Sequence, residues 1–182
     1  NQVAQRILHI VTELHQHIYI TLRLEIFAQH RPEQRKFHNA PLLAKGVRIF
    51  PQDGSGITKD LDLVVFSTAV EKDLPEPKRA AALGLRVQMR PVFLADLVAA
   101  HETYAVAGTS GKSTTSGMLA FLMRELGLQP NFIGGGRVSQ FKSSDNLGNS
   151  ISGSSDLLVV EACESDGSIV SYKPELTLIL NL

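Results

Sequence analysis

The segment Tyr104–Ala120, with the sequence YAVAGTSGKSTTSGMLA, constrains the fold more than any other part of the chain. Its first four residues form a short apolar run that predicts a buried strand. A turn of small residues, Gly108–Gly111, follows, and Lys112 and Ser113 then open a predicted helix. A glycine-rich turn lets the backbone approach an anion closely, and the N–H groups at a helix N-terminus point at that anion. This arrangement predicts a phosphate-binding loop.

The loop departs from the pattern GxxxxGK[ST] at one position. Val106 stands where that pattern has its first glycine, and Gly108 comes two residues later. In such loops the lysine reaches the β- and γ-phosphates and the next hydroxyl ligates Mg²⁺. The residues that we assign to a nucleotide-phosphate site are Gly108, Thr109, Ser110, Gly111, Lys112, Ser113 and Thr114. The alternative is an ordinary turn between strand and helix that binds no ligand.

Acidic residues follow a second predicted buried strand. Leu157–Val160 is the apolar run, and Glu161, Glu164 and Asp166 come after it. In nucleoside triphosphatases a carboxylate in this place holds Mg²⁺ opposite the Ser or Thr ligand of the loop. Mg²⁺ needs only one or two carboxylates besides water. Glu161 is therefore the predicted metal ligand, together with Ser113. Glu164 and Asp166 either orient water or substrate or are exposed loop charges.

The composition limits the class of protein. Lys+Arg and Asp+Glu number 18 each in 182 residues, and this zero net charge favours neither nucleic acid nor anionic membrane as a partner. No apolar run approaches the roughly 20 residues of a membrane helix, and we expect no signal peptide. Cys163 is the single cysteine, which is consistent with the reducing cytoplasm where we expect the protein to be.

Strand and helix patterns alternate along the chain. Apolar residues at helical spacing predict a helix over residues 2–30, with an exposed linker at 31–36. We expect strands at 46–50, 61–66, 85–89, 104–107, 157–160 and 176–180, the last one buried, and helices at 74–83, 91–100 and 112–126. The stretch 142–155, rich in Ser, Asn and Gly, is predicted to be a mobile surface loop. This alternation predicts an α/β fold with parallel strands.

The carboxyl ends of parallel strands are where ligands bind in such sheets. Ser67, Thr68 and Ala69 stand at such an end, although an ordinary exit from a strand explains them equally well. No GxGxxG motif occurs, so a dinucleotide site is not supported.

Four segments, in this order along the chain, resemble the Mur ligase family. VVFSTAVEKDLPE resembles the SSAI…NPE segment, and LRVQMRPVFLADL resembles the lead-in to the central domain. AVAGTSGKSTT resembles the GTxGKT/S loop, and VVEACESDGSIVSYKPELTLILN resembles the EADESD…P…TN stretch. The likeness is to the family's UDP-N-acetylmuramate–L-alanine ligase branch, which includes the murein-tripeptide ligase, and covers about residues 40–182. Ser110 replaces the usual histidine of that branch, and Cys163 an aspartate.

The resemblance implies a Rossmann-like N-terminal domain followed by the start of a P-loop ATPase-type central domain. The resemblance implies a partial UDP-substrate domain at 37–100 and a truncated ATP-binding domain at 101–182, and the apolar pattern predicts a helical segment at 1–36, which does not show the family's N-terminal strand and glycine-rich loop. We therefore expect the chain to be part of a longer ligase. This part alone is expected to bind nucleotide at best weakly and not to complete a ligation.

The implied activity is that of an ATP-dependent amide ligase of peptidoglycan precursor synthesis or recycling. Such an enzyme joins an amino acid or peptide to UDP-N-acetylmuramate through an acyl phosphate, with ATP and Mg²⁺. Lys112 and Glu161 are the implied catalytic residues. The residues implied for the substrate are Ser67, Thr68 and Ala69, near the UDP-sugar, and Gly135 and Gly136, in a loop facing the substrate.

Two other classes of function stay open. One is another phosphate-loop enzyme, such as a kinase or a GTPase, although the guanine-reading NKxD motif is absent from the sequence. The other is a nucleotide-binding module without turnover, or a ligase for another carboxylate. The sequence leaves the oligomeric state open.

Overall fold

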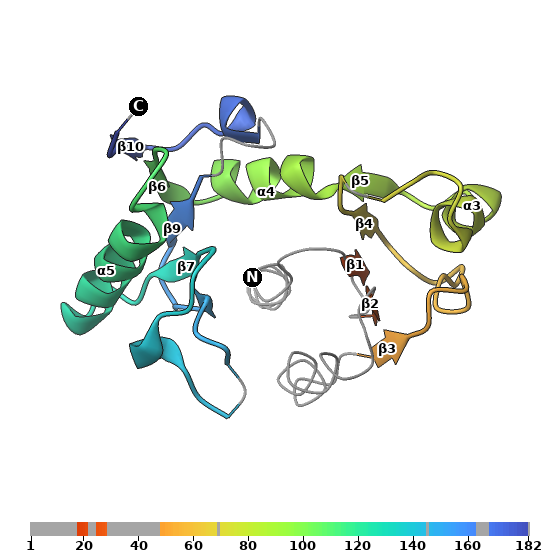
Figure 1. The fold of residues 1–182 in the computed structure, drawn as a ribbon, viewed down its shortest axis with the longest axis horizontal. Coiled ribbons are helices and arrows are strands. Elements are labelled where there is room, and N and C mark those ends of the chain that lie inside the picture. The colour runs from red at the N-terminus through yellow and green to blue at the C-terminus, as the bar shows by residue number, and fades with distance from the viewer. Residues whose placement is uncertain are drawn as a thin grey trace. The chain divides into compact units, whose positions relative to one another are not determined.

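The computed structural model describes residues 18–21, 25–28, 48–68, 70–144, 146–162 and 168–181. The chain divides into two compact units, one made of Leu14–Phe93 and the other of Asn1–Glu13 with Leu94–Leu182. Each unit contains a five-stranded sheet (Figure 1). Within the described residues, no helix is long and apolar enough to cross a membrane.

The sheet of the first unit has the strand order β3-β2-β1-β4-β5. Its strands are β1 (Ile18–Thr21), β2 (Glu25–Ala28), β3 (Arg48–Phe50), β4 (Val64–Phe66) and β5 (Val87–Met89). β2 runs parallel to β3, and β4 runs parallel to β5, whereas β1 is antiparallel to both of its neighbours. Helix α3 (Pro75–Ala82) connects β4 to β5, so this part is the predicted strand–helix–strand unit of an α/β fold.

The helix predicted over residues 2–30 is wrong for the part that the structure describes. Ile18–Thr21 and Glu25–Ala28 are strands. From Ile18 to Ile26 every second residue is Ile or Leu, and this spacing of two is typical of a strand. The helical spacing holds from Ile7 to Leu14, which lies outside the described residues, and extending it across residues 18–28 overlooked the change of period.

The core of the first unit forms around β4. Val64 and Phe66 pack with Ile57, Leu61 and Ala80, the last of these on α3. The strand predicted over 61–66 is confirmed in its second half, and the predicted helix at 74–83 is confirmed as α3. Prolines open α3 because a proline at the first helical positions sacrifices no hydrogen bond.

The sheet of the second unit has the strand order β10-β6-β9-β7-β8. Its strands are β6 (Glu102–Ala107), β7 (Asn131–Ile133), β8 (Ser150–Ile151), β9 (Leu157–Glu161) and β10 (Leu176–Ile179). Strands β10, β6, β9 and β7 run parallel to one another, whereas β8 is antiparallel to β7. The carboxyl ends of β6, β7, β9 and β10 therefore share one edge.

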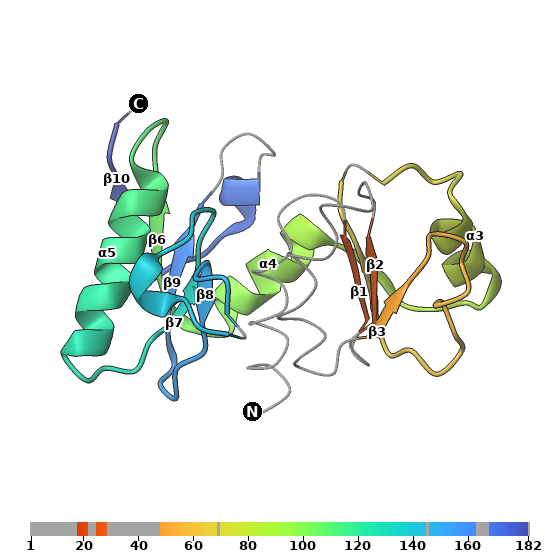
Figure 2. The same cartoon turned by 60° about the horizontal axis from the view of Figure 1, so that its bottom comes forward.

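Helices and short 3-10 turns connect these strands. α4 (Arg90–Ala99) precedes β6, α5 (Lys112–Glu125) follows it, and the 3-10 turns are η1 (Ser139–Phe141) and η2 (Ser168–Ser171). α5 lies along the sheet (Figure 2) and packs Ala120 and Met123 against Phe132 and Val159. The predicted helices at 91–100 and 112–126 and the predicted strands at 104–107 and 157–160 are thus confirmed.

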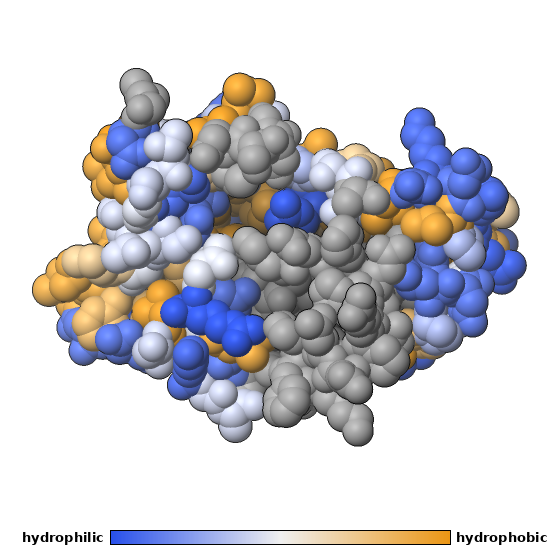
Figure 3. Space-filling model, in the orientation of Figure 1, coloured by the Kyte–Doolittle hydropathy of each residue, from blue (hydrophilic) through white to orange (hydrophobic). Residues whose placement is uncertain are grey.

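Two further expectations are corrected in this unit. Strand β10 is present, but all four of its residues are exposed, because it lies at an edge of the described sheet and pairs only with β6. Figure 3 shows apolar surface in the region of α5 and β10, to which Met118, Leu122, Leu178 and Ile179 contribute.

The predicted surface loop at 142–155 instead contains strand β8 and buried residues, among them Asn149 and Ser150. The Asn146 side chain holds this segment, since its Nδ2 donates to the Ser150 carbonyl at 2.8 Å and its Oδ1 accepts from the Gly148 N–H at 2.7 Å. A composition typical of loops thus gave no sign of these bonds.

The core of the second unit has an aromatic centre. Phe132 and Phe141 pack edge to face with ring centres 5.7 Å apart, and the Arg124 guanidinium lies 4.8 Å from the Phe141 ring centre. Arg124 also donates to the Gln140 carbonyl at 3.3 Å. These contacts hold η1 against α5.

Replacing Phe141 with leucine should lower the free energy of unfolding by about 1–2 kcal/mol, because the buried ring loses its contacts with the Phe132 ring and the Arg124 guanidinium and leaves a cavity. Urea denaturation followed by circular dichroism measures the change. Val170→Ala, at an 87% exposed residue, is the control and should shift stability by less than about 0.5 kcal/mol. Equal effects of the two substitutions would contradict the role of Phe141 in the core.

Candidate functional site

The loop between β6 and α5 begins at the shared carboxyl edge of the second sheet. Gly108 has φ +130° and Gly111 has φ +82°, both in the region that side chains other than glycine rarely adopt. Gly111 is the N-cap residue of α5, and Lys112 is its first helical residue. The first N–H groups of a helix have no acceptor within the helix, and its N-terminus carries partial positive charge. The local geometry is therefore suited to bind an anion.

The Glu161 carboxylate joins this loop to the loop after β7. The Ser113 hydroxyl donates to Oε1 at 2.9 Å, and the Gly135 N–H donates to Oε2 at 2.6 Å. A Cβ on Gly135 would lie 3.0 Å from both carboxylate oxygens, and one on Gly136 would lie 3.0 Å from the Ser113 Cβ. The structure thus brings together four residues that the sequence assigned to metal or substrate.

Lys112 lies half-buried at the start of α5. Its ammonium group donates a hydrogen bond to the carbonyl oxygen of Gly108, at the other end of the turn. The side chain therefore folds back across the loop, and its positive charge lies beside the N-terminus of α5. An anion at this place would meet the lysine and the helix together.

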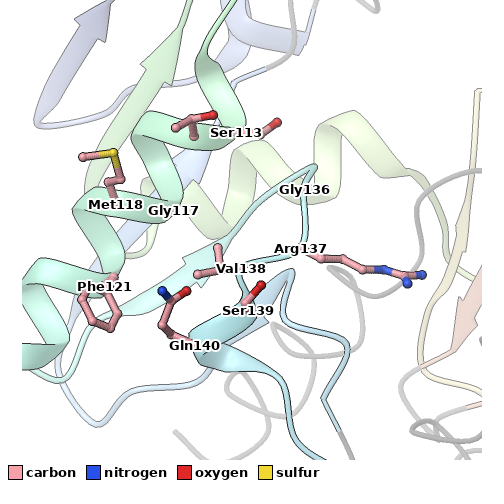
Figure 4. A pocket seen from close by; sticks show the side chains of 10 residues that line it. Ser113, Gly117, Met118, Phe121, Gly136, Arg137, Val138, Ser139 and Gln140 are labelled. Atoms are coloured by element: carbon pink, nitrogen blue, oxygen red, sulfur yellow. The ribbon is translucent and has the colours of Figure 1, made fainter.

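A pocket of about 360 Å³ extends from the loop along α5. Ser113, Gly117 and Phe121 line it on the helix, and Gly136 and Val138 line the opposite side (Figure 4). A Cβ on Gly117 would lie only 2.7 Å from the Val138 Cγ2. The segment that contains Val138 can therefore pack this closely against α5 only because residue 117 is glycine. This pocket was not predicted from the sequence. A glycine inside a helical pattern was the one available sign, because it often has a packing reason.

Several predicted residues lie elsewhere. Ser67 and Thr68 follow β4 in the first unit, and the Ser67 carbonyl accepts a hydrogen bond from the Val70 N–H at 3.1 Å. Ala69, Glu164 and Asp166 lie outside the described residues. Among the described residues, no three His, Cys, Asp or Glu side chains cluster as metal ligands. The candidate Mg²⁺ ligands are therefore one carboxylate and one hydroxyl.

Gly135→Ala should weaken the Mg²⁺-dependent binding of ATP about three- to tenfold, because the new methyl group pushes against both Glu161 oxygens and shifts the carboxylate. Isothermal titration calorimetry in the presence and absence of Mg²⁺ measures this effect. Gly84→Ala serves as the control: its φ of +65° makes the substitution strained, but its Cβ would meet nothing within 4 Å. That variant should lose stability without losing affinity.

The fold and the loop define an α/β protein with a strand–glycine turn–helix at the carboxyl edge of a parallel sheet. A family model described as the Mur ligase family, catalytic domain, matches residues 30–102. The UDP-N-acetylmuramate–L-alanine ligase of a Cyanothece species is 41% identical over 140 residues, which are 75% of this chain and 28% of that protein. Its counterpart from a Nostoc species is 35% identical over 170 residues, 90% of this chain and 33% of that protein. The chain belongs to the Mur ligase family.

Solved structures show the same relationship. The UDP-N-acetylmuramate-alanine ligase of Thermotoga maritima matches 84% of this chain with TM-score 0.72 and 28% identity, over 34% of its own length. The UDP-N-acetylmuramate:L-alanyl-gamma-D-glutamyl-meso-diaminopimelate ligase of Neisseria meningitides matches 85% with TM-score 0.68 and 27% identity, over 51% of its own length. This chain therefore spans a third or less of the two curated relatives and up to half of these structures.

Proposed function

We propose that this chain supplies the nucleotide-phosphate and Mg²⁺ site of an ATP-dependent amide ligase that acts on peptidoglycan precursors. The observation that carries the proposal is the position of the Glu161 carboxylate, which accepts hydrogen bonds from both Ser113 and Gly135 at the mouth of the phosphate loop. Family membership supports it, because the relatives are named as ligases of UDP-N-acetylmuramate.

The residues at this place fit ATP and Mg²⁺. Mg²⁺ prefers hard oxygen ligands and keeps several waters, and the Ser113 hydroxyl and the Glu161 carboxylate are two such ligands on neighbouring loops. Phosphate oxygens need N–H donors and positive charge, which the first turn of α5 and Lys112 supply. The positive φ values of Gly108 and Gly111 let the turn bring these groups together.

In the proposed reaction, these residues stabilise the negative charge on the transferring phosphoryl group. ATP supplies the phosphoryl group that turns a substrate carboxylate, a poor electrophile, into an acyl phosphate, from which an amine displaces phosphate to form the amide. Lys112 and the α5 N-terminus stabilise the negative charge on the transferring group, while Ser113 and Glu161 hold the metal. Lys112 and Glu161 are therefore our proposed catalytic residues.

The substrate assignment follows from the relatives and the site. We assign UDP-N-acetylmuramate as the carboxylate substrate and an amino acid or peptide as the amine, and we place the reaction in the cytoplasm. We assign Gly135 and Gly136 to a loop that faces the substrate, and we assign Ser67, Thr68 and Ala69 to the surroundings of the UDP-sugar. The boundary between 37–100 and 101–182 remains our proposal for the domain organisation, whereas the described strands β1 and β2 pair in one sheet with β3 and do not form a separate helical segment at 1–36.

Phosphate release by the complete gene product tests this function. The protein receives Mg·ATP, UDP-N-acetylmuramate and, one at a time, L-alanine, other amino acids and murein tripeptide. We expect release that requires both the sugar nucleotide and one particular amine. Measurable ATP binding without release from any pair would instead favour a Mur-like nucleotide-binding module, or a ligase for another carboxylate.

A further inference from the structure

Asn181 connects the end of β10 to the phosphate loop through its side chain. Its Oδ1 accepts hydrogen bonds from the Thr109 hydroxyl at 2.6 Å and from the Ser110 N–H at 3.0 Å. Its Nδ2 donates to the Ser110 carbonyl at 3.1 Å. The partners are 71 and 72 residues apart in sequence, so these bonds form only when β10 has paired with β6.

The backbone around Asn181 brings it against the loop. The Leu180 N–H donates to the Ala107 carbonyl at 3.1 Å, which continues the pairing of β10 and β6 to the base of the loop. A Cβ on Gly108 would lie 3.1 Å from the Asn181 carbonyl oxygen and 3.2 Å from its nitrogen. Gly108 is thus required both for its left-handed φ and for the close approach of Asn181.

The carboxamide of Asn181 determines where the polar groups of the turn point. The carboxamide accepts hydrogen bonds from the Thr109 hydroxyl and the Ser110 N–H, and it donates one to the Ser110 carbonyl. These groups are therefore turned toward β10. The N–H groups at the start of α5, which have no acceptor within the helix, remain the ones directed at an anion.

We propose that Asn181 is a positioning residue for nucleotide binding: it holds Thr109 and Ser110 in the turn so that the N–H groups of Gly111, Lys112 and Ser113 receive the phosphates. The proposal rests on the function proposed above and deepens it. A glycine-rich turn without this tie has many conformations, and binding must then order it at a cost in affinity. With Asn181 in place, the turn is already ordered before the nucleotide binds.

Asn181→Ala tests the proposal in the complete gene product, with Mg·ATP affinity measured by isothermal titration calorimetry. We expect a loss of about five- to twentyfold, since the three hydrogen bonds to the loop disappear. The Asn181 side chain is exposed, so the substitution leaves the core intact. Asn146→Ala is the matched control, because that carboxamide also bonds two backbone groups, away from the loop. Its affinity should stay within about twofold of the native chain.

A double-mutant cycle separates positioning from direct contact with the nucleotide. Thr109→Val removes the hydroxyl at nearly constant shape and should cost about threefold in affinity in the native background. In the Asn181→Ala background the same change should cost nothing further, because the hydroxyl acts through Asn181. Thr109→Ser keeps the hydroxyl and should bind like the native chain. Losses that multiply would show that Thr109 binds phosphate directly and would overturn the proposal.

The outcomes distinguish this proposal from the proposed function. If the native chain binds Mg·ATP and Asn181→Ala binds equally well, the positioning role is wrong and the nucleotide site stands. If the complete native gene product binds no Mg·ATP up to several millimolar, the proposed function and the role of Asn181 are both overturned. A loss confined to Asn181→Ala, with Asn146→Ala unaffected, supports both.

Discussion

Lys112→Ala is expected to weaken Mg·ATP binding by at least about thirtyfold, the equivalent of one or two charge-assisted hydrogen bonds to phosphate oxygens. Lys112 is the first residue of α5 and folds across the turn to the Gly108 carbonyl, so its charge lies where the phosphates would bind. Calorimetry with ATP up to several millimolar measures the loss, because weak binding is expected of this chain alone.

The control for this substitution is Lys173→Ala, which removes an exposed lysine of the same unit. It changes the net charge of the chain by the same amount, so it measures any general electrostatic effect. We expect affinity within about twofold of the native value. Unchanged Mg·ATP affinity in Lys112→Ala would contradict the interpretation of the turn as a phosphate-binding loop.

Glu161→Gln is expected to abolish the contribution of Mg²⁺ to ATP binding. In the native chain Mg²⁺ should raise the affinity for ATP about tenfold or more, and in the variant the two affinities should agree within about twofold, because the metal loses its carboxylate ligand. Titrations with Mg²⁺ and with a chelator give the ratio. An undiminished effect of Mg²⁺ in the variant would remove Glu161 from the metal site.

The same substitution should lower the free energy of unfolding by about 1–3 kcal/mol. Glu161 accepts two hydrogen bonds, and an amide has one acceptor oxygen, so either Ser113 or Gly135 loses its acceptor. Glu102→Gln is the matched control, since Glu102 begins β6 at the opposite edge of the sheet and accepts from the Tyr104 hydroxyl at 2.8 Å. It should leave the Mg²⁺ dependence unchanged.

Local patterns in the sequence predicted much of the second unit. An apolar run, two glycines and, from Met118 on, a stretch of good helix formers lie close together along the chain, and they were enough to predict β6, the turn and α5. Glu161 was predicted as a candidate metal ligand because it is the first polar residue after a buried run, and because parallel strands bring their carboxyl ends to one edge. The exposure of β10 was missed because an apolar run does not reveal how many neighbours a strand has.

By itself, the sequence determined the α/β class, the position of the strand, glycine turn and helix of the candidate site, and the membership of the Mur ligase family. Tertiary structure alone decided that β1 runs antiparallel to β4, that Val138 packs against α5 at Gly117, and that Asn181 holds the loop between β6 and α5. The physical reason is distance along the chain. Strand, turn and helix preferences act between neighbouring residues, whereas Asn181 lies 71 positions after Ser110 and meets it only once the chain between them has folded into a sheet.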